Sequence, residues 1–321
     1  MKLSSRIKST LRLPYGMLLS QQFYGNLGDP VNALLLKQDI EHVEVLKQRA
    51  LLNHLKLSTS YVDRKKKSDT LFVLGSGESI NYLTAQQWRI VKEHNSLAFN
   101  YFFAHTFIPD YYMIELNKWN EMHIFYNEIA KKKYANVDMF IQYEHALIAN
   151  YNFDNYPYPE NLYVHVPYRL PSSSCCQLKK NILYCQRKGL TQLFHHSSHT
   201  DCAILMGFLL GYKKIVLLGV DLNGSPYFTK ESAVQSSVFP CNDEYVKMNC
   251  IREAYMKSCG EYYMPMHPTM NKAHTSSYHA LTLRETISVY DEQILRPNGI
   301  QLFVGHAESI LSSDYPIYFV Q

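Results

Sequence analysis

Three histidines close together near the end of the chain are the residues best suited to proton transfer. The segment "MPMHPTMNKAHTSSYHAL" contains His267, His274 and His279. A histidine has an ordinary pKa near neutrality, so it can take a proton from a hydroxyl group as that group attacks another atom. His279 falls in a predicted helix, whereas His267 and His274 precede it. The alternative for each of them is an ordinary surface histidine.

A second chemical signal is a loop without bulky side chains. In "LFVLGSGESIN" a run of apolar residues leads directly into Gly75, Ser76, Gly77, Glu78 and Ser79. Glycines after a strand let backbone N–H groups approach a ligand closely, and the start of a following helix favours anions. The loop is neither a dinucleotide fingerprint nor a P-loop. A tight strand-to-helix turn with no ligand is therefore the alternative.

Polar residues also follow three other apolar segments that read as strands. In a parallel sheet, ligands bind beyond the carboxyl ends of the strands, so we expect these tips to line one site together with the glycine loop. An asparagine there offers both a hydrogen-bond donor and an acceptor, and its alternative role is a turn cap. The tip residues are Asn100, Glu115 and Asn117, Asp221 and Asn223, with Tyr227 just beyond.

The segment "HHSSHTDC", from His195 to Cys202, opens an apolar helix. Its hydroxyl groups and free N–H groups would suit a phosphate, and the candidate residues are Ser198, His199 and Thr200. The alternative is that Ser198 or Thr200 only caps the helix. The histidines of this segment have no carboxylate or cysteine partners at metal-ligand spacing, so we expect neither a metal nor a cofactor.

No Asp-x-Asp pair occurs in the chain. Many sugar-nucleotide transferases hold Mg²⁺ or Mn²⁺ with such a pair. A transfer reaction here would therefore have to stabilise its leaving phosphate with hydroxyl groups, amides and cations.

Strand and helix patterns alternate from residue 69 onward. Unbroken apolar strands such as "TLFVLG" and "KKIVLLGVDL" alternate with helices such as "TAQQWRIVKEH" and "TDCAILMGFLLGY". This predicts an α/β fold: a single Rossmann-like domain over 69–321, with a mostly parallel sheet and helices on both faces. Irregular segments at about 150–195 and 225–270 are expected to form a lid or acceptor-side subdomain. Residues 1–68 are expected to be an N-terminal helical extension, with a helix from about Pro30 to Leu57 and a basic linker at 64–67.

Composition narrows the function classes. The formal net charge of +4 is too small to argue for nucleic acid, and no stretch approaches the length of a membrane span. Seven cysteines without a C-x-x-C pair fit a reducing cytoplasm. The N-terminal "MKLSSRIKSTLR" combines basic and apolar residues at roughly helical spacing, which suits peripheral contact with the inner face of the cell membrane. A solvated N-terminus is the alternative, and a homo-oligomer stays open.

The order of the motifs resembles the bacterial sialyltransferases that decorate lipooligosaccharide, together with related capsule and O-antigen enzymes. The similarity covers about residues 70–115 and 195–305, through "GSGES", "AFN" and "SSHTDCAILMGFLLGYKKIVLLGVDL". The resemblance implies a Rossmann-like domain with a flexible lid. It also implies transfer without a metal from a donor of the CMP-sugar type.

Carried over by position, the resemblance places a set of residues at the nucleotide: Gly75, Gly77, Ser79, Asn100, Ser198, His199 and Thr200. Tyr227 falls where the family has a tyrosine on the departing phosphate, and Asn223 falls near a second such tyrosine. Glu115 matches a family asparagine close to the donor. The family's catalytic histidine precedes the last long helix, and His274 fits that spacing better than His267.

We therefore expect a metal-independent glycosyltransferase of surface polysaccharide biosynthesis. It would transfer a sialic acid-like or Kdo-like sugar from a CMP-activated donor to a glycan acceptor. Two alternatives stay open. One is a transferase that uses another activated sugar phosphate, such as a phosphoribosyl donor, and the other is a nucleotide-binding subunit without turnover.

Overall fold

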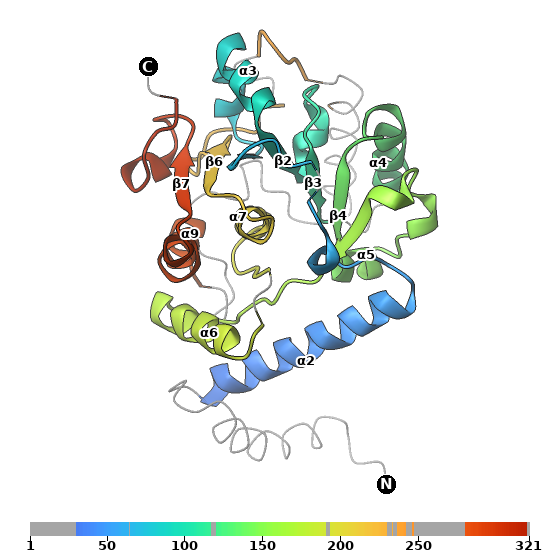
Figure 1. Cartoon of the computed structure of the whole chain (residues 1–321), viewed down its shortest axis with the longest axis vertical. Coiled ribbons are helices and arrows are strands. Elements are labelled where there is room, and N and C mark those ends of the chain that lie inside the picture. The colour runs from blue at the N-terminus through green and yellow to red at the C-terminus, as the bar shows by residue number, and fades with distance from the viewer. Residues whose placement is uncertain are drawn as a thin grey trace, which may run out of the picture.

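A single parallel sheet organises the part of the chain that the structure describes. The structure is a computed structural model, and it describes residues 30–63, 65–116, 120–190, 193–229, 233, 236–241, 246 and 280–319. In these residues the sheet has seven strands in the order β5-β4-β3-β2-β1-β6-β7, and every neighbouring pair is parallel (Figure 1). The strands are β1 (Thr70–Leu74), β2 (Asn95–Phe99), β3 (Tyr111–Ile114), β4 (Asp138–Gln142), β5 (Leu162–His165), β6 (Lys214–Leu218) and β7 (Gln301–Val304).

The strand order fixes where a ligand would be expected. Successive strands run from β1 toward β5 on one side, and the chain then returns to place β6 on the other side of β1. The order therefore reverses at β1, and ligands of such sheets bind outside the carboxyl ends of the strands at this switch point. The loop after β1 and the loop after β6 both lie there.

Helices cover both faces of the sheet, as the alternation in the sequence predicts. The helices are α2 (Pro30–Leu52), α3 (Ala85–Glu93), α4 (Asn120–Lys133), α5 (Tyr143–Ile148), α6 (Cys175–Arg187), α7 (His199–Leu209) and α9 (Leu283–Tyr290). Alternate side chains of β1 enter two different cores. Leu71 and Val73 belong to the core under α7 and α9, whereas Phe72 and Leu74 belong to the core that contains Trp88 of α3. The α/β fold is confirmed.

Helix α7 is apolar on all sides because it is buried on all sides. Its residues from His199 to Gly207 are all buried, as expected for a helix without a solvent face. It packs closely on the sheet at Gly207, where an added Cβ atom would lie 2.9 Å from the Cδ1 atom of Ile215. This contact sets the height of the helix over the sheet and so places its first turn at the carboxyl ends of the strands.

Helix α2 confirms the predicted N-terminal helix and ends earlier, at Leu52 instead of Leu57. His54 has a positive φ of 57° just after its end. Apolar residues of α2, including Leu36 and Val43, belong to the same core as α7. Its Asp39 accepts hydrogen bonds from the backbone N–H groups of Arg169 and Leu170. The assignment of 1–68 to a separate unit stays a prediction, and residues 1–29 lie outside the described part of the chain.

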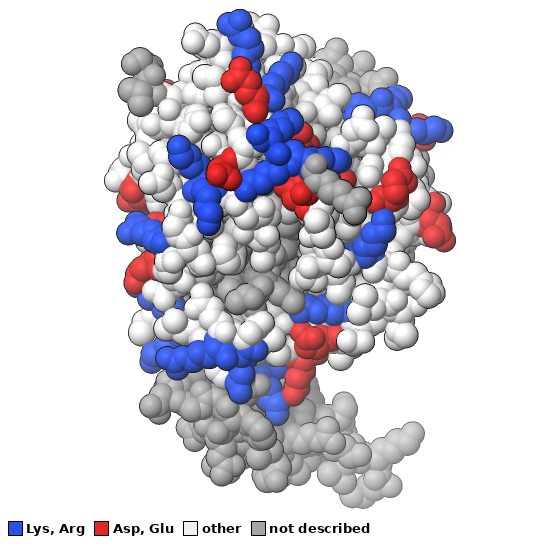
Figure 2. All heavy atoms as spheres, viewed as in Figure 1, with Lys and Arg blue, Asp and Glu red and all other residues white. Residues whose placement is uncertain are grey.

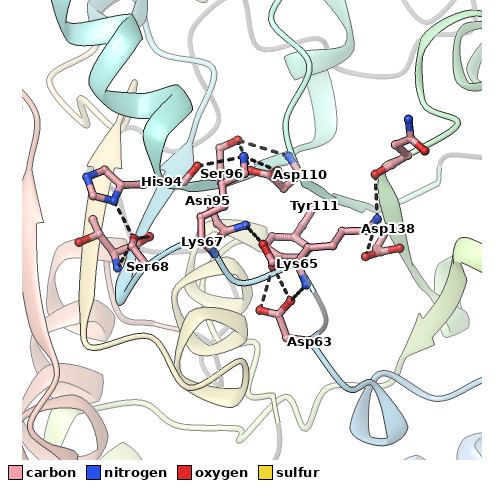
Figure 3. Close-up of polar contacts among 12 residues, drawn as sticks. Asp63, Lys65, Lys67, Ser68, His94, Asn95, Ser96, Asp110, Tyr111 and Asp138 are labelled. Atoms are coloured by element: carbon pink, nitrogen blue, oxygen red, sulfur yellow. Dashed lines mark hydrogen bonds and ion pairs between the residues drawn. The ribbon is translucent and has the colours of Figure 1, made fainter.

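The segment around the basic run crosses the amino ends of the central strands (Figure 3). The Asn95 side chain at the start of β2 accepts from Lys67 N–H at 2.6 Å and donates to the Lys65 carbonyl at 2.9 Å. The Lys65 ammonium pairs with Asp138 at 2.9 Å, and the Lys67 ammonium pairs with Asp110 at 2.7 Å. These lysines, predicted as a linker, make specific contacts with the starts of three strands.

Three boundaries differ from the sequence prediction. Strand β5 and helix α6 lie within the segment expected to be irregular at 150–195; the strand is only four residues long, so it shows too few alternations to be recognised. The pattern of "SLAFNYFF" predicts one strand, whereas strand β2 ends at Phe99 and a 3-10 turn begins at Asn100. Helix α9 begins at Leu283 because Thr282 caps it. A lid role for 150–195 and 225–270 stays a prediction.

The surface seen in Figure 2 mixes both signs of charge. Lysine and arginine side chains lie next to aspartate and glutamate side chains across this face. Lys66 and Asp69 form an exposed ion pair of this kind at 2.9 Å. Within the described ranges, none of the helices has the length and apolar character needed to cross a bilayer.

Candidate functional site

The glycine-rich loop after β1 packs directly against the loop after β6. Gly75 N–H donates to the Leu218 carbonyl and Gly77 N–H donates to the Gly219 carbonyl, both at 2.7 Å. A Cβ atom on Gly75 would lie 2.4 Å from the Gly219 carbonyl oxygen, and one on Gly77 would lie 2.4 Å from an Asp221 carboxylate oxygen. The glycines are therefore required by the contact between two protein loops. A role at a nucleotide stays a prediction.

Asp221 joins the same two loops through its side chain. Its carboxylate accepts from the Ser79 backbone N–H at 3.0 Å and also from the Ser79 hydroxyl group. Burial raises the pKa of Asp221, while the hydrogen bonds from Ser79 lower it in part. Nearby, the Ser76 carbonyl accepts from Phe228 N–H at 3.1 Å. Ser76, Ser79 and Asp221 are buried, and they connect the loops at the switch point of the sheet.

Asn223 and Tyr227 lie further along the loop after β6. Asn223 is exposed, and its amide donates to the Glu308 carbonyl at 2.9 Å while its Oδ1 atom accepts from Ser225 N–H at 2.9 Å. This amide therefore shapes the loop. Tyr227 pairs with Gly77 through an isolated antiparallel bridge, and its ring packs against Tyr101 with centroids 5.5 Å apart. Tyr227 thus connects the glycine loop with the residue after Asn100.

Asn100 joins the ends of β2 and β3. Its φ of 46° lies in the left-handed region, which asparagine tolerates better than most residues. Its Oδ1 atom accepts from Glu115 N–H at 3.1 Å, and its carbonyl accepts from the Tyr112 hydroxyl at 2.6 Å. The two predicted strand tips, Asn100 and Glu115, are in direct contact at the carboxyl edge of the sheet.

The first turn of α7 is capped by its own residues. Ser198 is the N-cap, and its side chain accepts from Thr200 N–H at 3.2 Å. The carboxylate of Asp201 accepts from the N–H groups of His196, Ser197 and Ser198. Several N–H groups that could hold a phosphate are thus already bonded, and the capping alternative for Ser198 is confirmed. A role for Ser198 and Thr200 at the nucleotide stays a prediction.

His199 reaches from this turn into a buried group of histidines and carboxyls. Its Nδ1 atom lies 3.0 Å from Asn100 Oδ1, and its Nε2 atom lies 3.3 Å from Nε2 of His165 at the end of β5. Beside them, His195 Nε2 lies 3.5 Å from a carboxylate oxygen of Glu115. Burial lowers the pKa of His165 to about 3 and holds that of His199 well below its usual value. Both rings are therefore neutral near pH 7.

Sequence reasoning missed His165 and Gln142 of this group. They are register partners at the carboxyl ends of β5 and β4, and both are buried. Neither the Gln142 amide nor His165 Nδ1 has a hydrogen-bond partner in the described part of the chain. A polar residue at the end of an apolar strand was the signal that found Asn100, and it applies equally to "VDMFIQ" and "LYVH".

The catalytic candidates His267 and His274 lie outside the described residues, and so do Asn117 and His279. Ala280 to Thr282, which precede α9, are not helical. The choice among the three histidines stays a prediction.

A hollow of about 220 Å³ lies at the opposite, amino edge of the sheet. It is lined in part by Lys67, Lys92 and Asp110. The Lys67 ammonium is already paired with Asp110 at 2.7 Å, and the Lys92 ammonium lies over the Phe239 ring at 5.0 Å. Both of these lysine ammonium groups are thus engaged with other groups of the protein. In the part of the chain described, no group of three potential metal ligands occurs.

Glu115 should make the stability of the protein depend on pH. Burial raises its pKa to about 7, against the smaller lowering effects of Asn100 and Arg169. A carboxyl whose pKa is higher in the folded state binds its proton more tightly there, so its contribution to stability falls as pH rises from about 4.5 to about 7. We expect Glu115→Gln to become more stable relative to wild type by on the order of 2 kcal/mol between pH 5 and pH 8. Urea unfolding at both pH values measures this, and an unchanged difference would contradict it.

Comparison with known proteins gives structural similarity only. No family model matches the chain, and no curated protein matches it. Among solved structures, the chain is similar to the monofunctional alpha-2,3-sialyltransferase Cst-I from Campylobacter jejuni, with a TM-score of 0.45 and 14% identity over 82% of this chain and 85% of that chain. It is also similar to the sialyltransferase CstII from the same organism in complex with CMP-3FNeuAc, with a TM-score of 0.41 and 12% identity over 77% of this chain and 85% of that chain. These are bacterial sialyltransferases, the class that the sequence motifs resemble.

Proposed function

We propose that this chain is a metal-independent glycosyltransferase that takes a sugar from a CMP-activated donor, sialic acid-like or Kdo-like, in the assembly of a bacterial surface polysaccharide. The observation that carries the proposal is the meeting of Asn100, Glu115 and His199 at the carboxyl edge of the sheet. This meeting lies beside the switch point at β1, where α/β sheets bind nucleotides. The motif order along the sequence supports the choice of donor.

The nucleotide would lie across the carboxyl ends of β1 and β2. The Asn100 amide nitrogen donates one hydrogen bond to the Glu115 carboxyl group, and its second N–H would donate to a ligand. The Tyr227 hydroxyl would donate to the phosphate as it departs. Tyr227 is suited to this by its contacts with Gly77 and Tyr101, which hold it between the glycine loop and the end of β2.

The reaction would be a direct displacement at the anomeric carbon of the donor sugar. A histidine, His274 or His267, would take the proton from the acceptor hydroxyl as its oxygen forms the new glycosidic bond. The bond between the anomeric carbon and the phosphate oxygen breaks, and its electron pair leaves with CMP. Hydroxyl and amide donors would stabilise the charge on that phosphate, in keeping with the lack of an Asp-x-Asp pair in the sequence.

The N-terminus supports peripheral contact with the inner membrane face. Lys2, Arg6, Lys8 and Arg12 alternate with apolar residues and have no acidic neighbours. Such a segment would lie on anionic lipid and bring the enzyme to a membrane-linked acceptor.

The test is CMP release from a panel of CMP-sugars, with a glycan acceptor, in the presence and absence of EDTA. We expect release from at least one donor at the same rate in both conditions. Loss of activity on chelation would contradict the absence of a metal. Pyrophosphate release from phosphoribosyl pyrophosphate would favour the alternative donor. A higher melting temperature with CMP and no consumption of any donor would favour a binding subunit.

A further inference from the structure

The distances around Asn100 determine which atoms donate and which accept in its hydrogen bonds. The side-chain atom near Glu115 N–H, at 3.1 Å, must be an acceptor, and therefore it is the amide oxygen. The same oxygen lies 3.0 Å from Nδ1 of His199. Because an amide oxygen cannot donate, His199 must carry a proton on Nδ1.

The proton on Nδ1 of His199 determines the protonation of the next two nitrogens, Nε2 of His199 and Nε2 of His165. His199 is buried and its pKa is held low by burial and by the neighbouring rings of His165, His195 and His145, so the ring is neutral. A neutral ring protonated on Nδ1 has a bare Nε2 atom. That atom lies 3.3 Å from Nε2 of His165, which must then donate. His165 is in turn neutral, with burial as the main cause, so its Nδ1 atom is bare.

The result is a hydrogen-bond chain in which every bond is donated in the same direction. His165 donates to His199, His199 donates to the Asn100 oxygen, and Glu115 N–H donates to the same oxygen. The acceptor capacity of the Asn100 side chain is thus used inside the protein. Its amide nitrogen donates a side-chain hydrogen bond to the Glu115 carboxyl group, which leaves its second N–H for a ligand, and Asn100 is only half-buried.

We propose that His165 and His199 are positioning residues that hold the Asn100 amide as a pure hydrogen-bond donor. The group that Asn100 recognises is therefore an acceptor, such as a carbonyl or phosphate oxygen, and not a hydroxyl or amino group that donates. That this acceptor belongs to a cytidine nucleotide rests on the proposed function. The donor-to-acceptor direction of the hydrogen-bond chain does not depend on it.

The direction of these hydrogen bonds can be measured without a ligand. Long-range ¹H–¹⁵N NMR spectra of the full chain labelled with ¹⁵N-histidine report which ring nitrogen carries the proton. His199→Gln and His165→Gln variants assign the signals. We expect His199 protonated on Nδ1 and His165 protonated on Nε2, with both patterns unchanged from pH 8 to about pH 5. The opposite tautomer at either ring, or titration of either ring near pH 6.5, would overturn the proposal.

The effect on binding is measured by calorimetry with CMP as the probe. His165→Leu removes the donor to His199, and we expect its affinity for CMP to fall about tenfold. His165→Gln retains an N–H donor, and we expect its affinity to stay within about threefold of wild type. A merely structural role would lower the melting temperature of both variants and leave their affinities equal to that of wild type, which would overturn the proposal. If wild type binds no CMP, the proposed CMP-sugar donor is wrong. The NMR result alone then decides the direction of the hydrogen bonds.

Discussion

Gly77→Ala should destabilise the protein by about 3 kcal/mol. The added Cβ atom would lie 2.4 Å from an Asp221 carboxylate oxygen and 2.8 Å from the Gly219 carbonyl oxygen. The carbonyl oxygen belongs to backbone, and the carboxylate is held by Ser79, so neither can move away without breaking hydrogen bonds. The midpoint of urea unfolding measures the effect.

Gly189→Ala is the matched control. Gly189 has a positive φ of 69°, and nothing lies within 4 Å of its added Cβ atom. Only backbone strain remains there, and we expect a loss of about 1 kcal/mol. If Gly77→Ala were no less stable than Gly189→Ala and instead lost affinity for CMP, the glycine would serve a ligand, and our account of the loop contact would be wrong.

Replacing the histidine that we propose as the general base should have the largest effect on turnover. We expect His274→Ala, or failing that His267→Ala, to lower kcat by about 10²-fold or more, because the acceptor hydroxyl would lose its general base. The affinity for CMP should stay unchanged, since the base acts on the acceptor and not on the nucleotide. Steady-state CMP release gives the rate, and calorimetry gives the affinity.

His54→Asn provides the control for this series. His54 is exposed beyond the end of α2, and asparagine tolerates its positive φ of 57°. We expect full activity from this variant. If His274→Ala and His267→Ala both retain the wild-type rate, the base assignment is wrong. His279→Ala would then be the next variant to measure.

Most of the fold could be predicted from the sequence because its central strands contain unbroken apolar runs. "LFVL" of β1 and "IVLL" of β6 are buried on both faces, and such runs between helical patterns indicate a parallel sheet. Strand β5 was missed because "LYVH" is short and lies among proline and asparagine residues. Its place at the edge of the sheet depends on pairing with β4, which is a non-local contact.

The positions of the site residues were easier to predict than their roles. Gly75 and Gly77 do lie at the switch point, but the atoms that require them belong to the loop after β6. Sequence gives no distance between two loops that are separated by more than a hundred residues. For the same reason, the hydroxyl of Ser79 and the carboxylate of Asp221 could not be recognised as partners of each other.

The role of Asn100 as a hydrogen-bond donor is the clearest example of a property that the sequence could not reveal. An asparagine offers a donor and an acceptor, and the sequence contains no sign of which one is used. The answer depends on His199 and His165, which follow Asn100 by 99 and 65 residues and approach it only in the folded chain.

The central claim is that a cytidine nucleotide binds where β1 and β2 end. A crystal structure of the full chain grown with CMP tests this most directly. Our account predicts CMP across the carboxyl ends of these strands, with an acceptor oxygen or ring nitrogen within hydrogen-bond distance of Asn100 Nδ2. CMP bound at the amino edge beside Lys67 and Lys92, or a nucleotide that leaves Asn100 untouched, would contradict it.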